Sequence, residues 1–378
     1  MADINHRVVS PIPAVECTVA QYTPLRERYP LKRQSANPAG RRVGRTVGFC
    51  LVGAAILLAA ACSGSGGRES GGGAEAGGQT VSETAYTLAV IPKGTTHVFW
   101  KSVEAGARRA GDEQVVEIIW KGPLKENDRA QQIQVVQQFI SQNVDGIVLA
   151  PLDLHALVAP VRQAAERGIP VVIMDSALEG EPGEDFVSFV ATDNARGGRL
   201  GGEHLAELLD GRGRVVLLRY LVGSASTTAR EEGFLDAVRG GGGIEVLVEN
   251  RYAGPTAGEA KTQALNMFDR VRSADGIFCS NEPSTYGMLL ALRQEGLAGQ
   301  IRFVGFDASP PLVEALEAGE IDALVVQNPD RMGYEAVATL VRHLRGQEVP
   351  PVVDTGVALI TRENLDEPDI RALIAPGG

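Results

Sequence analysis

Five polar side chains stand where short apolar runs of this sequence end, and each can give or accept hydrogen bonds. They are His97, Asp175, Asn281, Asp307 and Gln327. A hydrogen bond to a charged group contributes roughly 1.5–3 kcal/mol, against about 1 kcal/mol between neutral groups. Carboxylate, amide and imidazole groups that meet at one place therefore predict a binding site for a polar small molecule.

The apolar runs that precede these side chains predict the elements that position them. LAVI, GIVLA, VVIM, GIFC, FVGF and ALVV are four or five residues long and apolar throughout. Runs of this kind are typical of strands buried on both faces of a parallel sheet. Ligands of open α/β sheets bind at the carboxyl ends of the strands, which is where the five side chains fall.

Strands and helices alternate from Tyr86 onward, which indicates βαβ units. The alternation runs through one set of strands, ending in FVSFVAT, and then starts again with TDNARGGRLGGEHLAELLDG. We interpret this as two similar α/β lobes, each with a parallel sheet, rather than one large sheet.

Composition and motifs exclude several classes of function. Only 5% of residues are aromatic and the net formal charge is −11, which disfavours a nucleic-acid partner. The sequence has no GxGxxG directly after a strand, no GxxxxGK[ST], no HExxH, no CxxC pair and no GxSxG. We therefore expect no enzyme activity, no cofactor and no metal site.

The amino-terminal segment predicts export. Arg41, Arg42 and Arg45 precede VGFCLVGAAILLAAA, an apolar run that ends in small residues before Cys62. A basic region, a short apolar region and a small-residue cleavage site mark a secretory signal. The run is shorter than the roughly 20 residues that span a bilayer, although a transmembrane anchor is the alternative.

The join LLAAAC is similar to a bacterial lipobox, which predicts lipidation of Cys62 after cleavage. Residues 1–61 are then a leader, and the Gly/Ser-rich residues 62–85 a tether. Cys279 is the one cysteine left outside the leader and lipidation site, and at a strand end we expect it to be buried.

From Thr87 to about Leu365 the chain resembles the ribose-binding-protein family of type I periplasmic sugar-binding proteins. The resemblance rests on several stretches in order, namely GTTHVFWKSVEAGA, VDGIVLAPLD, GIPVVIMDSA, VATDNARGG, GSASTTAREEGF, ADGIFCSNEPSTYGMLLAL and VGFDASPPLVEALEAGEIDALVVQNPDRMGY. It implies two Rossmann-like lobes joined by a three-crossover hinge near 191–192, 327–328 and 355–356. The expected lobes are 86–192 plus 328–356 and 193–327 plus 357–378.

The resemblance also implies which residues bind the ligand. Matching positions are Phe99, Trp100, Asp175, Asn281, Phe306, Asp307 and Gln327. Four positions depart from ribose binders: His97, Ala150 and Ser176 replace two asparagines and an arginine, and Thr228 replaces a second arginine, with Arg230 two places on. We include His97 and Arg230 among the ligand residues and expect the departures to set the sugar preference.

Simpler interpretations remain open for several of these residues. Asp307 and Asn281 could cap the helices that follow them. Arg230 could form a surface ion pair with Glu231 or Glu232. Trp120 and Lys121, which end the second strand, could border the site, and Asp193 is expected first as a hinge residue and helix cap.

The expected function is that of a monomeric, exported, lipid-anchored binding protein that delivers a monosaccharide or polyol to an ABC permease in the cytoplasmic membrane. A sugar needs charged or amide partners at its hydroxyls and flat aromatic groups against its faces. The alternative is a sensor that presents the sugar to a chemoreceptor or membrane kinase. A lac-repressor-type regulator shares the fold, but it would need a DNA-binding segment where this chain has a signal sequence.

Overall fold

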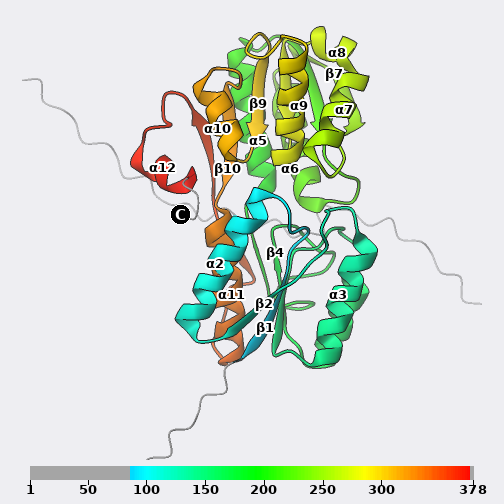
Figure 1. Cartoon of the computed structure of the whole chain (residues 1–378), viewed down its shortest axis with the longest axis vertical. Coiled ribbons are helices and arrows are strands. Elements are labelled where there is room, and N and C mark those ends of the chain that lie inside the picture. Colours follow the sequence, from blue (N-terminus) through cyan, green and yellow to red (C-terminus); the bar gives the residue numbers. More distant parts are fainter. Residues whose placement is uncertain (1–85, 375–378) are drawn as a thin grey trace, which may run out of the picture. The chain divides into compact units, whose positions relative to one another are not determined.

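Apolar runs and helices alternate through residues 86–374, the part of the chain that the computed structural model describes. They form two six-stranded sheets with helices on both faces (Figure 1). The expected leader, tether and lipidation site at Cys62 lie outside the described residues. Among residues 86–374, no helix has both the length and the apolar character needed to cross a membrane.

The first lobe is built on a sheet whose strands are all parallel, in the order β11-β5-β4-β3-β1-β2. Its strands are β1 (Thr87–Ile91), β2 (Glu117–Trp120), β3 (Gly146–Leu149), β4 (Val171–Met174), β5 (Ser188–Ala191) and β11 (Val352–Asp354). Its helices are α2 (Val98–Gln114), α3 (Arg129–Gln142), α4 (Val158–Glu166) and α11 (Pro329–Leu344).

The second lobe repeats this plan with the order β12-β10-β9-β8-β6-β7. Its strands are β6 (Gly213–Arg219), β7 (Ile244–Tyr252), β8 (Gly276–Cys279), β9 (Arg302–Phe306), β10 (Ala323–Gln327) and β12 (Val357–Thr361). Its helices are α5 (Asn194–Leu208), α6 (Ala225–Gly240), α7 (Ala257–Asn266), α8 (Phe268–Arg272), α9 (Glu282–Gln294) and α10 (Pro310–Glu317), followed by α12 (Pro368–Ile374).

Alternate residues of the strands feed two cores in each lobe. In β1, Leu88 and Val90 pack with α2 and α11, whereas Ala89 and Ile91 pack with α3 and α4. Figure 1 shows α2 and α11 on one side of the first sheet and α3 on the other. Burial on both faces explains why these strands are apolar throughout, and it leaves only their ends free to carry polar groups.

The chain passes between the two sheets three times. It leaves β5 for α5, leaves β10 for α11, and passes from β11 to β12 through Thr355 and Gly356. The type I periplasmic binding protein fold, with two α/β lobes and three crossovers, is thus confirmed.

One edge strand departs from the expectation of wholly parallel sheets, because β12 pairs antiparallel with β10. The chain leaves the second sheet at the end of β10 and returns to it from the hinge only two residues after β11. It must therefore enter beside the point where β10 ends and run in the opposite direction. The helical segment between β7 and β8 consists of two helices, α7 and α8, separated at Met267.

Glycines let helices cross very closely in both lobes. In the second lobe a Cβ atom on Gly198 of α5 would lie 1.9 Å from the carbonyl oxygen of Arg230 in α6. In the first lobe a Cβ atom on Gly106 of α2 would lie 1.9 Å from the carbonyl oxygen of Asp330 in α11. The helices α5 and α11 follow the first and second crossovers of the hinge, so each crossing joins a helix that leaves the hinge to another helix of the same lobe.

Candidate functional site

A cavity lies between the two lobes, at the carboxyl ends of the parallel strands of both sheets. We call it the central cavity. Side chains of both lobes line it, and among them are most of the residues that the sequence predicts.

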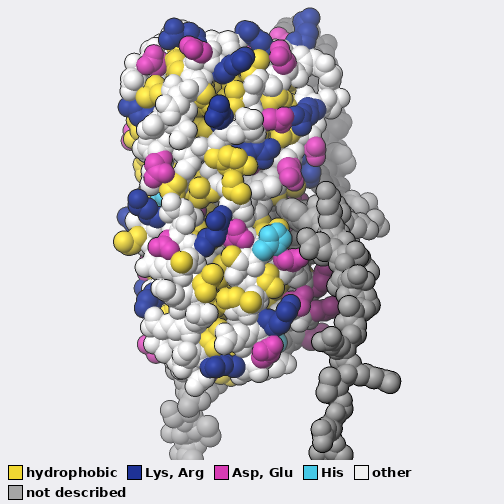
Figure 2. Space-filling view, turned by 90° about the vertical axis from the view of Figure 1, so that its right-hand side faces the viewer, with side chains coloured by type: hydrophobic (Ala, Val, Ile, Leu, Met, Phe, Trp, Pro, Cys, Tyr) yellow, Lys and Arg dark blue, Asp and Glu magenta, His cyan; other side chains and the backbone are white. Residues whose placement is uncertain are grey.

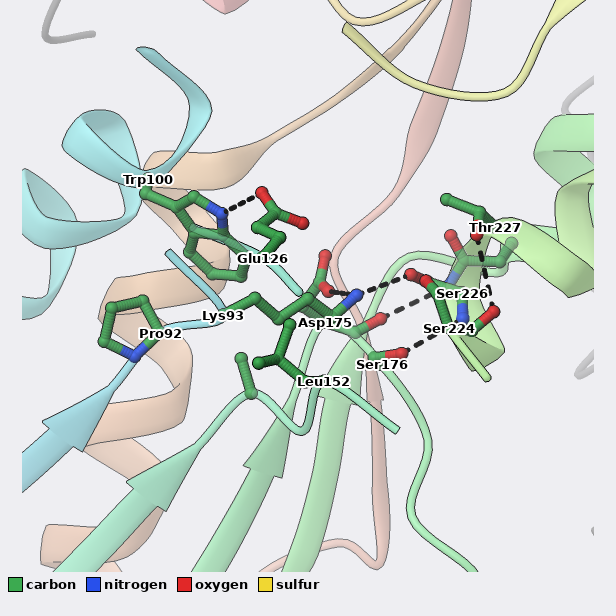
Figure 3. A network of polar contacts seen from close by, with 12 residues as sticks. Pro92, Lys93, Trp100, Glu126, Leu152, Asp175, Ser176, Ser224, Ser226 and Thr227 are labelled. Atoms are coloured by element: carbon green, nitrogen blue, oxygen red, sulfur yellow. Dashed lines mark hydrogen bonds and ion pairs between the residues drawn. The ribbon is translucent and has the colours of Figure 1, made fainter. Parts of the chain in front are cut away.

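In the first lobe, the ends of β1 and β4 bring a lysine and an aspartate together. Lys93 Nζ lies 2.7 Å from Asp175 Oδ2, and both side chains are almost fully buried. The lysine also donates a hydrogen bond of 2.9 Å to Ser226 Oγ, on α6 of the second lobe (Figure 3). Ser226 N in turn donates to Ser176 Oγ at 3.0 Å, so the polar contacts continue from one lobe to the other.

A second acidic group enters the first-lobe wall from the loop between β2 and α3. Glu126 Oε1 lies 2.8 Å from His97 Nδ1 and accepts a hydrogen bond of 2.7 Å from Trp100 Nε1. Burial alone would lower the pKa of His97, but the hydrogen bond and the charge of Glu126 outweigh it and raise that pKa. Burial would raise the pKa of Glu126, yet His97 holds it below its ordinary value. The two groups therefore stabilise each other as an ion pair.

Aromatic groups lie beside this pair at the start of α2. Trp100 is buried, whereas Phe99 is half-buried, and the two rings meet edge to face with centroids 5.0 Å apart. Both line the central cavity. A half-buried ring at a cavity wall can cover the C–H face of a sugar ring.

The second-lobe wall contains a buried arginine from α6. Arg230 Nε donates to Asn194 Oδ1 at 2.8 Å, and Nη1 donates to the carbonyl oxygen of Ser280 at 3.0 Å. Its guanidinium lies 4.0 Å from the centroid of the Phe306 ring. Burial lowers the pKa of Arg230, although the charges of Asp307 and Asp175 oppose this shift.

Asn281 and Asp307 organise the amino end of α9. Asn281 caps the helix, accepting a hydrogen bond from Ser284 N in a capping box. Asp307 Oδ2 accepts from the backbone N–H of Glu282 at 3.0 Å, and Oδ1 accepts from Gln327 Nε2 at 2.8 Å. Burial raises the pKa of Asp307, and Arg230 opposes this shift.

Eight of the nine predicted ligand residues line the central cavity. They are His97, Phe99, Trp100, Asp175, Arg230, Asn281, Asp307 and Gln327. Phe306 lies instead behind Arg230, fully buried, because the side chains of β9 alternate and its own enters the core with Phe278 and Val325. Its position supports the arginine rather than the cavity wall.

Helix capping and surface ion pairing, the simpler roles considered for Asn281, Asp307 and Arg230, are observed only for Asn281. Asn281 does cap α9, but it also lines the cavity. Ser309 rather than Asp307 is the N-cap of α10. Arg230 is buried and makes no surface ion pair, since Glu231 pairs with Arg219 at 2.8 Å.

Three further residues singled out in the sequence also have definite positions. Asp193 caps α5, as expected, with Oδ1 accepting from Arg196 N. Lys121 points away from the cavity to hydrogen-bond Gln138, and Trp120 packs against the first-lobe core.

Several residues that line the cavity were not predicted as ligand residues. They are Lys93, Glu126, Tyr220, Ser226, Thr227, Glu282 and Pro283. Tyr220 directly follows β6 and Lys93 lies two residues after β1, so the rule that predicted Asp175 could have found them. Glu126 lies six residues beyond the end of β2, and no periodicity in the sequence indicates which residue of that loop turns inward.

Some polar atoms of this site have no hydrogen-bond partner among the described residues. They are Tyr220 Oη and Gln327 Oε1, and both residues line the cavity. Burial raises the pKa of Tyr220 well above its ordinary value, so its hydroxyl keeps its proton and can donate. A buried polar group left without a partner costs about 1–3 kcal/mol. The arrangement therefore favours a ligand rich in hydroxyl groups.

Within residues 86–374, no cluster of three or more His, Cys, Asp or Glu side chains is arranged to hold a metal ion. Cys279 is fully buried in the second-lobe core, and burial raises the pKa of its thiol well above the ordinary value. On the face shown in Figure 2, basic and acidic side chains are interspersed.

Comparison with protein families gives a match over residues 88–348 to the periplasmic binding protein domain. Among curated proteins, a D-ribose/D-allose-binding protein of Pseudomonas aeruginosa is 29% identical, over 72% of this chain and 88% of that protein. The ribose import binding protein RbsB of Salmonella typhimurium is 26% identical, over 75% of this chain and 94% of that protein.

Solved structures give the same result. The periplasmic component of an ABC-type sugar transport system from Hahella chejuensis is 38% identical with a TM-score of 0.70, covering 73% of this chain and all of that one. A carbohydrate transporter solute-binding protein from Agrobacterium radiobacter, in complex with D-arabinose, is 32% identical with a TM-score of 0.74, covering 78% of this chain and all of that one.

Proposed function

The chain belongs to the periplasmic binding protein family, and we propose that it is an exported solute-binding protein that captures a monosaccharide or polyol for an ABC importer. Its relatives are sugar-binding proteins of the ribose-binding type rather than enzymes. The observation that carries the proposal is the central cavity, whose buried polar atoms are incompletely paired and whose aromatic groups lie at one side.

The proposed mechanism is closure of the two lobes over the ligand. Several hydrogen bonds already join the lobes, among them Lys93 to Ser226, Ser226 to Ser176, and Leu154 N to the carbonyl oxygen of Gly223 at 3.0 Å. A ligand that contacts both walls gains most of its binding energy only when the lobes are closed. Binding therefore shifts the open–closed equilibrium toward the closed form.

The ligand preference of this protein follows from the side chains that line the cavity rather than from all four departures from ribose binders. Of those four positions, His97 lines the cavity, whereas Ala150 is in the first-lobe core and Ser176 is used in the contact between lobes. Lys93, Glu126 and Tyr220 are the other polar groups through which we expect the preference to be set.

A thermal-shift screen of the purified protein against pentoses, hexoses and polyols tests the binding function. A ligand at about 100 times its Kd adds about 2.7 kcal/mol of stability, which is readily seen in the melting temperature. A panel in which no sugar or polyol raises the melting temperature would contradict the proposal.

A strain that lacks the gene separates import from sensing. Loss of uptake of the sugar found in the screen supports transport, whereas normal uptake with lost chemotaxis or induction supports the sensor. The lipid anchor has its own test: Cys62→Ser should move the protein from the membrane fraction to the soluble fraction.

A further inference from the structure

Three hydrogen-bond acceptors lie together at one edge of the central cavity. They belong to Glu282, Asp307 and Gln327, and these residues also line a second cavity. The second cavity continues beside the hinge, between the start of α2 and the end of α12, and its other lining groups are mostly apolar. The three acceptors therefore form the boundary between two spaces that a ligand could reach.

The two carboxylates at this boundary have no cationic partner in direct contact. Among the described residues, neither Glu282 nor Asp307 forms a salt bridge, whereas Lys93 pairs with Asp175 and His97 with Glu126. The hydrogen bonds to the pair come from neutral donors, namely Gln327 Nε2, Ser309 Oγ and the backbone N–H of Glu282. The guanidinium of Arg230 is used by Asn194 and Ser280.

The sum of charges around the central cavity also indicates an excess of negative charge. Four carboxylates line it, on Glu126, Asp175, Glu282 and Asp307, while the cations are Lys93, Arg230 and His97. Even with His97 protonated, one negative charge is left over. The amino end of α9 offsets about half a charge at most.

The side chain of Gln327 gives independent evidence for a missing hydrogen-bond donor. Gln327 is 2% exposed, and its Oε1 atom has no hydrogen-bond partner among the described residues. Its Nε2 atom is already committed to Asp307, so the free end of this amide can only accept. Two carboxylates outside any salt bridge, one uncompensated negative charge and a free carbonyl oxygen all favour a donor, and a positively charged donor satisfies them best.

We propose that the ligand is an amino sugar or amino polyol whose ammonium group binds at the edge formed by Glu282, Asp307 and Gln327. This inference rests on the proposed sugar-binding function and narrows its ligand class.

Calorimetry at about pH 6.5, where a sugar amine is protonated, tests the proposal. D-Glucose is compared with its 2-, 3-, 4- and 6-amino-deoxy forms, D-ribose and myo-inositol with their mono-amino forms, and N-acetylated forms serve as uncharged controls. At least one amine should bind about tenfold more tightly than its hydroxyl parent, the difference between charged and neutral hydrogen bonds.

Glu282→Gln should reduce the ratio of amine to parent affinity by about tenfold, and it should not lower the melting temperature of the free protein. Glu245→Gln, on the exposed part of β7, is the matched control and should leave the ratio unchanged. If neutral sugars bind and none of the amines binds more tightly, the amine assignment is wrong and the sugar-binding function stands. If neither class binds, both are wrong.

Discussion

The two lobes place an aspartate at the same point of their sheets but give it different partners. Asp175 follows β4 and Asp307 follows β9, both with left-handed backbone angles, φ 62° and 68°. Each backbone N–H bonds to the neighbouring strand, at 3.0 Å to Val190 and at 2.8 Å to Val325. Asp175 has a lysine of its own lobe at 2.7 Å, whereas Asp307 has only neutral donors in direct contact.

This difference extends to the other acids of the two walls. In the first lobe, Glu126 is paired with His97 and its pKa is lowered. In the second lobe, burial and the charge of Asp307 raise the pKa of Glu282, although His97 opposes the shift. Each of the two first-lobe acids therefore has a cationic partner in direct contact, whereas Glu282 and Asp307 are the acids for which the proposed ammonium group of the ligand would be the partner.

The largest expected effect is on folding, from Asp175→Ala. This change leaves Lys93 buried without its partner, and breaking a buried pair in this way costs about 3–5 kcal/mol. Urea denaturation of the ligand-free protein measures it. The double variant Lys93→Met with Asp175→Leu should recover much of the loss, and a cost below about 1 kcal/mol for the single variant would contradict the pairing of Lys93 with Asp175.

Asp307→Ala should affect binding more than folding. It removes the charged acceptor of the second-lobe wall, so the affinity for the best-binding sugar should fall by about 2–3 kcal/mol, or roughly 30- to 150-fold. Calorimetry measures this loss. Asp236→Ala, at an exposed position of α6, is the control and should bind normally. If Asp307→Ala bound the sugar as tightly as the unaltered protein, the proposed difference between the first-lobe and second-lobe walls would be wrong.

Gly198→Ala tests how tightly the second-lobe wall is held. The added methyl group meets the carbonyl oxygen of Arg230, so α5 and α6 must separate, at a cost of about 1–3 kcal/mol in stability. The displaced Arg230 should also weaken binding. Gly258→Ala, where a Cβ atom meets nothing within 4 Å, should be neutral or slightly stabilising in a thermal melt.

The smallest expected effect is the pH dependence of the first-lobe ion pair. His97 has a raised pKa, so its contribution is complete below its unfolded pKa of 6.5 and is lost as the pH rises through the folded value. Glu126 has a lowered pKa, so its contribution is complete above 4.5 and is lost as the pH falls through the folded value. His97→Gln should therefore cost most between these two pH values, about 1 kcal/mol. Urea denaturation of both proteins across this pH range measures the loss of unfolding free energy in His97→Gln. A loss that did not change with pH would contradict the ion pair.

The fold could be predicted from the sequence because burial on both faces leaves a continuous apolar run for almost every central strand. The direction of β12 could not, because it depends on where the chain re-enters the second sheet rather than on any local pattern. Phe306 shows a similar limit. Its position next to Asp307 was predictable, but the side to which its ring points depends on the alternation of β9.

The site could be predicted where strand ends provide its residues, and less well elsewhere. Asp175, Asn281, Asp307 and Gln327 follow that rule, and all four line the cavity. Glu126 comes from a loop, and its inward position depends on hydrogen bonds with His97 and Trp100 of another element. Such long-range pairing leaves no periodic signal in the chain.

The glycine crossings have a mechanical consequence. Because α5 is held against α6 and α11 against α2 without intervening side chains, each helix that leaves the hinge forms a stiff lever with a helix at the cavity. A pull on Arg230 or on Phe99 is then transmitted along that lever to the linking segments, with little loss through side-chain rearrangement. In the proposed closure, bending would therefore be concentrated in the three short linkers, and a small ligand would determine the angle between two much larger lobes.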